Sequence, residues 1–176
     1  RPGMYIGSTS TKGLNHLIYE IVDNAVDEHL AGFCSEIHVT LEKDGSATVV
    51  DNGRGVPVGM HAKGMSAARL VYTTLHAGGK FDDSAYKTSG GLHGVGSSVV
   101  NALSAWMDVE ISRDGYVHHD RYERGVPVIE LEDGLLPKIS KTRKTGTKVS
   151  FLPDDTIFEK TKFRGEEIKS RMHETA

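Results

Sequence analysis

The chain has 176 residues, a formal net charge of −3 and a sequence pI of about 6.3. A chain of this length can bury a sizeable core without disulfides, so we expect residues 1–176 to form a single domain. The slightly acidic balance excludes a domain-wide basic field that would attract nucleic acid. Because Cys34 is the single cysteine and no apolar run reaches about 18 residues, we expect a cytoplasmic protein with no disulfide framework and no membrane partner.

The first two elements are predicted to be a helix and a β-hairpin. Apolar residues recur at helical spacing from Leu14 to Leu30, and Gly32 is suited to end this helix. Apolar and polar residues then alternate over residues 37–41, and a turn leads into the apolar residues 47–50. The segment that follows, residues 51–57, is a loop rich in turn-forming residues.

The rest of the chain is predicted to contain three more helices and several strands. One helix would begin at Ser66, whose side chain would cap it, and run to Leu75. The next would run from the end of a glycine-rich segment to about Ala105, and the last would span residues 164–174. The predicted strands cover residues 107–111, 116–123, 126–131 and 147–152, with a tight turn at Asp114-Gly115 between the first two. We expect the basic segment 138–144 to be a mobile connection between the last two strands.

Helices and hairpins mix here without a regular βαβ alternation. This order favours an α+β fold, a two-layer sandwich in which a mixed, mostly antiparallel sheet carries helices on one face.

Residues 90–96, Gly-Gly-Leu-His-Gly-Val-Gly, place four glycines in seven positions just before an apolar stretch. Glycine lets backbone N–H groups approach a ligand, and a helix starting at Gly96 or Ser97 would point its free N–H groups into this loop. The run is therefore either a phosphate-binding loop or a flexible connector. It is not a P-loop, because Ser97 rather than Lys follows the last glycine, and no apolar strand precedes it as a dinucleotide fingerprint requires.

An arc of polar side chains lies opposite the apolar stripe of the first predicted helix: His16, Glu20, Asp23, Asn24 and Asp27. An exposed helix face usually pairs its acids with Lys or Arg, but this arc holds three acids and neither base. It is either a solvated face or a site for water activation and Mg²⁺ coordination. Asp51 lies where a predicted strand runs into a glycine loop. Its carboxylate is equally suited to form an Asx turn or to bind a ligand.

Six blocks together resemble one protein family. Three of the blocks resemble the three ATP-site motifs of the GHKL ATPases, the superfamily of gyrase, Hsp90, histidine kinases and MutL. These blocks are residues 20–25, 51–55 and 90–96. The other three blocks narrow the resemblance to the ATPase domain of bacterial type IIA topoisomerases, which lies in the B subunits of gyrase and topoisomerase IV. These blocks are residues 1–7, 76–81 and 96–103. The resemblance implies ATP hydrolysis that drives DNA strand passage, with ATP and Mg²⁺ as cofactors.

The resemblance also implies a role for each matching residue. Glu20 would be the general base that activates water for attack on the γ-phosphate, with His16 helping to orient it, and Asn24 would coordinate Mg²⁺. Asp51 would accept the adenine amino group, helped by a bound water and Thr147.

Other residues would complete this implied site. Arg54 would pair with Glu28 and line the pocket mouth. Lys80 would neutralise phosphate charge, Tyr86 would reach the adenine, and residues 78–96 would form a lid whose part 81–89 is mobile in the empty protein. The remaining implied binding residues are Gly55, Pro57, Leu92, His93, Gly94, Val95, Gly96 and Arg113.

The implied partners are a second copy of the same chain on ATP binding, the A-type subunit, ATP-competitive inhibitors, and DNA through the holoenzyme rather than through this domain. The family's N-terminal arm and transducer domain lie outside the six blocks, so we expect this fragment to bind ATP, hydrolyse it slowly and be mostly monomeric. Three positions depart from the family: Asn15 stands where a His is common, and Ala68-Arg69 replace a common Val-Glu pair.

Several alternatives stay open. The domain could be a nucleotide switch without hydrolysis, a histidine kinase domain or, less in keeping with the motifs, a dinucleotide-binding oxidoreductase. Residues 31–34 favour gyrase, whereas residues 87–89 and 154–158 favour topoisomerase IV.

Overall fold

The structure is a computed structural model that describes residues 11–74 and 96–156. Several predicted features lie outside these residues: most of the lid, the last helix, and the site residues Lys80, Tyr86, Leu92, His93, Gly94 and Val95.

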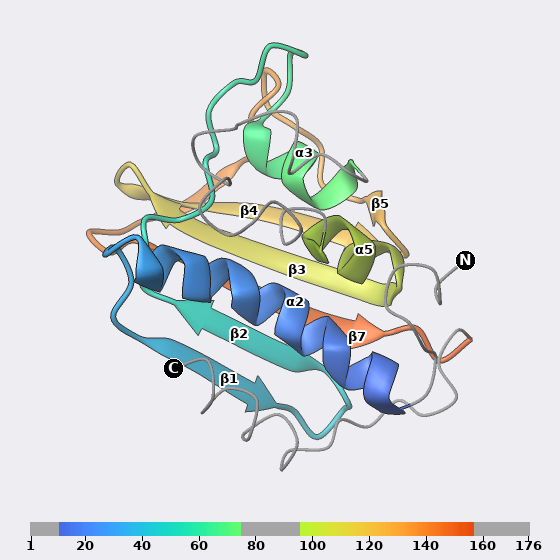
Figure 1. The fold of residues 1–176 in the computed structure, drawn as a ribbon. Helices are drawn as coiled ribbons and strands as arrows, with labels where there is room; N and C mark the ends of the chain where they lie inside the picture. Colours follow the sequence, from blue (N-terminus) through green and yellow to red (C-terminus); the bar gives the residue numbers. More distant parts are fainter. Residues whose placement is uncertain (1–10, 75–95, 157–176) are drawn as a thin grey trace.

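The described residues form two layers, a seven-stranded sheet and a layer of helices on one face of it (Figure 1). The strands are β1 (Ile37–Leu41), β2 (Ala47–Asp51), β3 (Ser104–Arg113), β4 (Tyr116–Glu123), β5 (Val126–Pro127), β6 (Lys138–Lys141) and β7 (Gly146–Pro153). Their order is β1-β2-β7-β3-β4-β5, with β6 also paired to β4, and every pairing among the described residues is antiparallel. The helices are α2 (Thr11–Leu30), α3 (Ala67–Thr73) and α5 (Gly96–Ala102). The predicted two-layer fold is confirmed.

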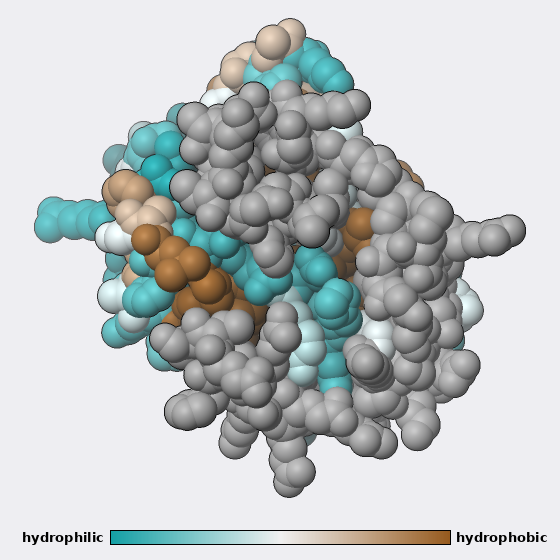
Figure 2. All heavy atoms as spheres, in the orientation of Figure 1, coloured by the Kyte–Doolittle hydropathy of each residue, from teal (hydrophilic) through white to brown (hydrophobic). Residues whose placement is uncertain are grey.

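Helix α2 crosses the sheet and buries its apolar stripe, with Leu14, Leu17 and Ile18 fully inaccessible to solvent. The helix ends in a Schellman motif at the predicted glycine. The N–H of Gly32 donates to the carbonyl of His29 (3.0 Å), and the N–H of Phe33 donates to the carbonyl of Glu28 (2.9 Å). Phe33 is thereby placed directly after the last turn of α2. Figure 2 shows hydrophobic surface over the C-terminal half of this helix.

The sheet buries one face because its strands alternate. Met107, Val109 and Ile111 of β3 are fully buried, and the residues between them face the other side. In the register of the sheet Met107 lies opposite Phe151 of β7 and Tyr122 of β4, so apolar side chains from three strands meet under the helices. The turn between β3 and β4 is the predicted Asp114-Gly115 pair.

Four local predictions were wrong in detail. The third predicted helix ends at Ala102 rather than Ala105, because Ser104 already belongs to β3. Ser66 occupies the N-cap position of α3, which ends at Thr73, but its hydroxyl donates to the carbonyl of Val58 (2.9 Å) and makes no cap hydrogen bond.

The other two errors concern the strands after β4. The predicted strand 126–131 shortens to β5, whose second residue, Pro127, has no N–H with which to continue a ladder. The basic segment expected to be mobile instead contains β6, which pairs with β4. None of the helices in the described part of the chain has the length and apolarity that a membrane span requires.

Candidate functional site

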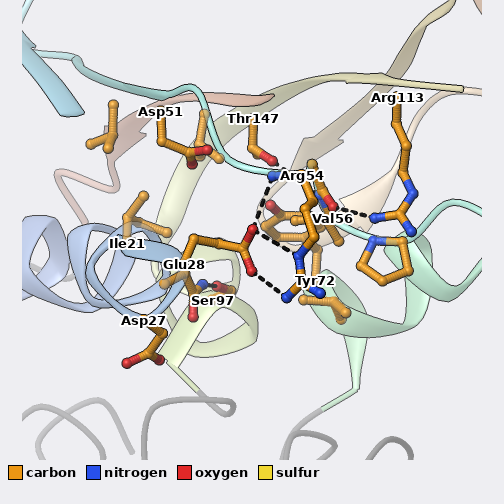
Figure 3. Close-up of a pocket in the computed structure, with 16 residues that line it drawn as sticks. Ile21, Asp27, Glu28, Asp51, Arg54, Val56, Tyr72, Ser97, Arg113 and Thr147 are labelled. Atoms are coloured by element: carbon orange, nitrogen blue, oxygen red, sulfur yellow. Dashed lines mark hydrogen bonds and ion pairs between the residues drawn. The ribbon is translucent and has the colours of Figure 1, made fainter. Parts of the chain in front are cut away.

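A cavity of about 300 Å³ lies between α2, the sheet, α3 and the loop after β2 (Figure 3). Its walls combine apolar residues from each of these elements, including Ile21, Val49 and Val71. Seven of the residues predicted from sequence line it: Asn24, Asp51, Arg54, Gly55, Pro57, Arg113 and Thr147. A concave pocket in which apolar walls carry convergent polar groups is the usual form of a small-molecule site.

Asp51 and Thr147 form a polar pair in the inner wall of the cavity. They lie opposite each other in the register of β2 and β7, and Figure 3 shows their side-chain oxygens pointing into the pocket. Burial raises the pKa of the Asp51 carboxyl above its ordinary value, although N–H groups of Gly53 and Thr147 oppose this rise. The Gly53 N–H donates to Oδ1 of Asp51 (2.9 Å), so the Asx turn exists, and the carboxyl lines the pocket as well.

The hydroxyl of Thr147 has a defined orientation. Its Oγ1 accepts a hydrogen bond from the N–H of Val56 (3.1 Å), so its own proton is left to donate elsewhere. The pair therefore offers a ligand one strong acceptor and one donor side by side.

The predicted ion pair between Arg54 and Glu28 closes one side of the pocket mouth. Arg54 Nη2 lies 2.7 Å from Glu28 Oε1, and Nε and the backbone N–H of Arg54 donate to Oε2 (3.2 and 2.9 Å). Burial raises the pKa of Glu28, but the hydrogen bonds and charge of Arg54, together with the charge of Arg113, outweigh this effect and hold the pKa below its ordinary value. Arg113 in turn donates to the carbonyl of Gly55 (2.7 Å).

The backbone at Gly55 requires glycine. Its φ is +85°, and a Cβ there would lie 2.9 Å from the carbonyl oxygen of Ser112 and 3.1 Å from Cγ2 of Ile111. The loop can therefore pass close to the sheet and carry Arg54 to the pocket mouth.

A second polar group lies where α2 meets the start of α5. His16 Nε2 is 3.1 Å from Glu20 Oε1, and Nδ2 of Asn24 donates to Oγ of Ser97 (2.5 Å). The carboxyl of Glu20 packs on Gly96, where a Cβ would overlap Oε2 and lie 3.0 Å from Cδ. Helix α5 begins at Gly96, as the glycine run predicted, and the glycine leaves room for the carboxylate.

The polar side chains of α2 fall into two groups, one at the cavity and one at the start of α5. Asn24 and Asp27 line the cavity, while His16 and Glu20 lie at the start of α5. Asp23 is not among the residues that line the cavity. Across residues 11–74 and 96–156, no three His, Cys, Asp or Glu side chains cluster closely enough to hold a metal ion.

Sequence reasoning missed three contributors to the site. Ser97 follows the glycine run directly and could have been found from that position. Tyr72 lines the cavity from α3, and Phe33 places its ring 3.9 Å from the guanidinium carbon of Arg54. Neither aromatic residue belongs to one of the six blocks, and residues 31–34, which include Phe33, served only to weigh gyrase against topoisomerase IV.

This fold and this pocket define a class of ATPase domain. Residues 9–157 match the family described as "Histidine kinase-, DNA gyrase B-, and HSP90-like ATPase", and the chain belongs to this family. The predicted GHKL resemblance is confirmed.

The relatives narrow the class. The chain is 60% identical over 178 residues to the B subunit of DNA topoisomerase 4 from Streptococcus pneumoniae, and 58% identical over 177 residues to that from Enterococcus faecalis. Both matches cover 100% of this chain, but 27% and 25% of the relatives, so the chain spans about a quarter of their length.

A solved structure shares the fold: the 43K ATPase domain of Thermus thermophilus gyrase B in complex with an aminocoumarin. The TM-score is 0.85 with 44% sequence identity, and the match covers 100% of this chain and 43% of that one.

Proposed function

We propose that this chain is the ATP-binding and ATP-hydrolysing domain of a bacterial topoisomerase IV B-type subunit, whose ATP cycle drives DNA strand passage. The observation that carries this proposal is that one cavity brings together two polar pairs. Asp51 and Thr147 lie in its inner wall, and Asn24 and Ser97 lie beside Glu20. Topoisomerase 4 relatives at 56–60% identity, against 44% for the gyrase B structure, favour topoisomerase IV over gyrase.

The inner wall suits an adenine ring. The Asp51 carboxylate would accept from the exocyclic amino group, and the Thr147 hydroxyl would donate to a ring nitrogen, directly or through a bound water. The apolar side chains of Ile21, Val49 and Val71 would pack on the flat ring. Buried polar groups that need a partner of matching chemistry discriminate strongly against bases that lack it.

The start of α5 suits the triphosphate and the attacking water. Glu20 would remove a proton from that water as its oxygen bonds to the γ-phosphorus and the bond to the β-γ bridging oxygen breaks. His16 would hold the carboxylate in place through its contact with Oε1.

Mg²⁺ would be held at this end by the amide oxygen of Asn24, because the amide nitrogen is engaged with Ser97. A single protein oxygen suits this ion, which usually keeps several waters and binds substrate phosphates. The ion would neutralise charge on the phosphates.

The remaining predicted residues belong to this proposal as well. Lys80 would neutralise phosphate charge, Tyr86 would approach the adenine, and backbone N–H groups of Leu92, His93, Gly94, Val95 and Gly96 would surround the phosphates. Arg54, Pro57 and Arg113 would line the mouth, where an ATP-competitive inhibitor would also bind. In the whole enzyme the partners would be a second B-type subunit, the A-type subunit and DNA.

The test is Glu20→Gln in the full-length protein, with Glu42→Gln as the control at an exposed carboxyl of the same type. A general base contributes about 10²- to 10⁴-fold, so kcat for ATP hydrolysis should fall by at least about 100-fold while ATP still binds. Unchanged hydrolysis in the Glu20 variant would favour the alternative of a switch that only binds nucleotide. Decatenation without negative supercoiling, measured with the A-type subunit present, would separate topoisomerase IV from gyrase.

A further inference from the structure

Asn52 lies outside the nucleotide pocket and binds the segment that joins α2 to β1. We call this segment, residues 31–36, the connector. Oδ1 of Asn52 accepts the backbone N–H groups of Ser35 and Glu36 (both 2.9 Å), and Nδ2 donates to Oγ of Ser35 (2.8 Å). The N–H of Asn52 also donates to the carbonyl of Glu36 (3.3 Å). One exposed side chain therefore makes three hydrogen bonds to residues 16 and 17 positions away in the sequence.

These contacts use most of the hydrogen-bonding capacity of the Asn52 amide. A side-chain amide has two acceptor lone pairs and two donor hydrogens, and here Oδ1 accepts twice and Nδ2 donates once. Asparagine in a turn usually bonds its own backbone two residues further on. Asn52 instead joins its loop to a different segment of the chain.

The connector is itself fixed to α2 and to the loop that follows β2. Nδ1 of His29, in the last turn of α2, lies 2.8 Å from the carbonyl oxygen of Cys34. On the loop side, the ring of Phe33 lies 3.9 Å from the guanidinium carbon of Arg54, and Arg54 pairs with Glu28 of α2. The connector is thus an ordered support to which the Asn52 side chain fastens the loop.

Asp51 depends on this support because it directly precedes Asn52. It is the last residue of β2 and lies opposite Ile37 of β1 and Thr147 of β7. Its Oδ1 accepts the N–H of Gly53, on the other side of Asn52 (2.9 Å). The backbone around Asn52 therefore determines where the Asp51 carboxyl points.

We propose that Asn52 is a positioning residue for nucleotide binding, which holds the Asp51 carboxyl in the orientation that accepts the exocyclic amino group of adenine. This inference rests on the proposed function and adds to it a residue that is absent from the lining of the pocket. Without the amide the loop would sample several conformations, and nucleotide binding would have to order it again. Ordering the backbone of one residue lowers affinity by about five- to thirtyfold.

The test compares two turn residues at opposite ends of the β1–β2 hairpin in the full-length protein. Asn52→Ala removes the side-chain contacts to the connector. Asp44→Ala is the matched control, because Oδ1 of Asp44 accepts the N–H (2.8 Å) and the hydroxyl (2.6 Å) of Ser46 where β1 turns into β2. Both substituted residues are exposed, and both variants lose hydrogen bonds from a side chain to the backbone of this hairpin. Only Asn52 adjoins Asp51.

ATP binding and hydrolysis give the first measurement. We expect Asn52→Ala to raise the Kd and the KM for ATP by about five- to thirtyfold. Its kcat should match that of the wild type, because Glu20 lies on α2 and the lost interaction acts on binding alone. Asp44→Ala should match the wild type in both parameters. Urea unfolding of each protein measures any loss of stability separately.

Base preference gives the second measurement, the ratio of kcat/KM for ATP to kcat/KM for GTP. Guanine carries an oxygen where adenine carries the amino group, so a well-placed carboxylate favours ATP. A displaced Asp51 should lower this ratio, whereas a general loosening of the pocket would weaken both nucleotides alike. Ser35→Ala removes one of the hydrogen bonds of Asn52 and should lower the ratio by a smaller amount, which provides a milder variant for the same test.

Rescue by a conservative variant gives the third measurement. Asn52→Asp keeps the shape of the side chain and the oxygen that accepts from Ser35 and Glu36, and the Ser35 hydroxyl can donate to the second oxygen. This variant should therefore restore the ATP affinity and the ATP-to-GTP ratio that Asn52→Ala loses.

The outcomes separate this inference from the proposed function. Unchanged ATP affinity in Asn52→Ala would overturn the inference, and so would an equal loss in Asp44→Ala. A lower kcat with unchanged KM, weaker binding with an unchanged ATP-to-GTP ratio, or no rescue by Asn52→Asp would overturn it as well. Failure of the wild type to bind ATP would instead contradict the proposed function.

Discussion

The substitution Asp120→Asn should destabilise this chain more than its small size suggests. Asp120 of β4 is 1% exposed and lies beneath α3, where Arg69, 9% exposed at its side chain, reaches it with two hydrogen bonds (2.6 and 2.9 Å). The hydroxyl of Tyr122 donates to the same carboxylate (2.5 Å), and Arg69 also donates to the carbonyl of Ile129 (2.7 Å). The carboxylate thus holds two buried donors from two elements.

The expected magnitude follows from what the variant leaves behind. Asparagine has the same shape, but its NH₂ group would face the guanidinium of Arg69, and a buried cation would lose its counter-charge. Removing one partner of a buried ion pair costs about 3–5 kcal/mol, a third or more of the stability of many domains, which is about 5–15 kcal/mol. The hydrogen bonds and charge of Asp120 hold the pKa of Arg69 above its ordinary value although burial lowers it, so Arg69 stays charged.

The assay is urea unfolding of the chain followed by circular dichroism, with Asp108→Asn as the control. Asp108 lies on the opposite face of the sheet, 25% exposed, with Arg121 at 3.1 Å and His119 at 3.0 Å. Pairs of this more exposed kind contribute about 0–1 kcal/mol. A loss below about 1 kcal/mol for Asp120→Asn, or equal losses for both variants, would refute the reasoning.

A triple replacement checks the cause. Arg69→Met/Asp120→Leu/Tyr122→Phe removes every polar member of the cluster, and buried ion pairs replaced by apolar residues of similar volume are often neutral or stabilising. The triple variant should therefore be more stable than Asp120→Asn. The pair with Asp120 also gives the buried Arg69 its counter-charge.

Three further predictions concern the nucleotide pocket of the full-length protein. Gly96→Ala should move the Glu20 carboxylate, which a Cβ would overlap, and lower kcat by up to about 100-fold with little change in ATP affinity. An unchanged kcat would contradict the proposed role of Glu20. Phe33→Leu removes the ring that stacks on Arg54 and should weaken nucleotide binding about two- to fivefold, an effect that must disappear in an Arg54→Ala background. Burial raises the pKa of Asp51, and the proposed adenine contact needs its carboxylate as acceptor, so ATP affinity should fall as the pH drops through that raised value. Titration calorimetry from about pH 7 to 4 should show a flatter profile for Asp51→Asn.

Local chemistry explains what could be read from the sequence. The apolar stripe of α2, the glycine that ends it, the β1–β2 hairpin and the β3–β4 turn each depend on residues a few positions apart. Periodicity and turn preference determine such features before any distant contact forms. The family resemblance then pointed to seven of the residues that line the pocket, and its predicted pairing of Arg54 with Glu28 is present.

The predictions that were wrong failed because contacts outside the local segment decided the structure. The basic segment 138–144 was expected to be a mobile connection, yet β4 provides the edge with which β6 pairs. Ser66 was expected to cap a helix, but the carbonyl of Val58, brought near by the fold, takes its hydroxyl. In both cases a partner from another part of the chain decided the outcome.

The sequence by itself determined the helices, the hairpins and the residue types that ATP chemistry needs. Tertiary structure alone decided which of them meet: Asn24 with Ser97 across 73 residues, Val56 with Thr147 across 91, and Arg69 with Asp120 across 51. The reason is physical, because a hydrogen bond or ion pair between distant residues depends on the path of the whole chain. A local pattern can supply the donor and the acceptor, but only the packed layers of sheet and helices bring them within about 3 Å of each other.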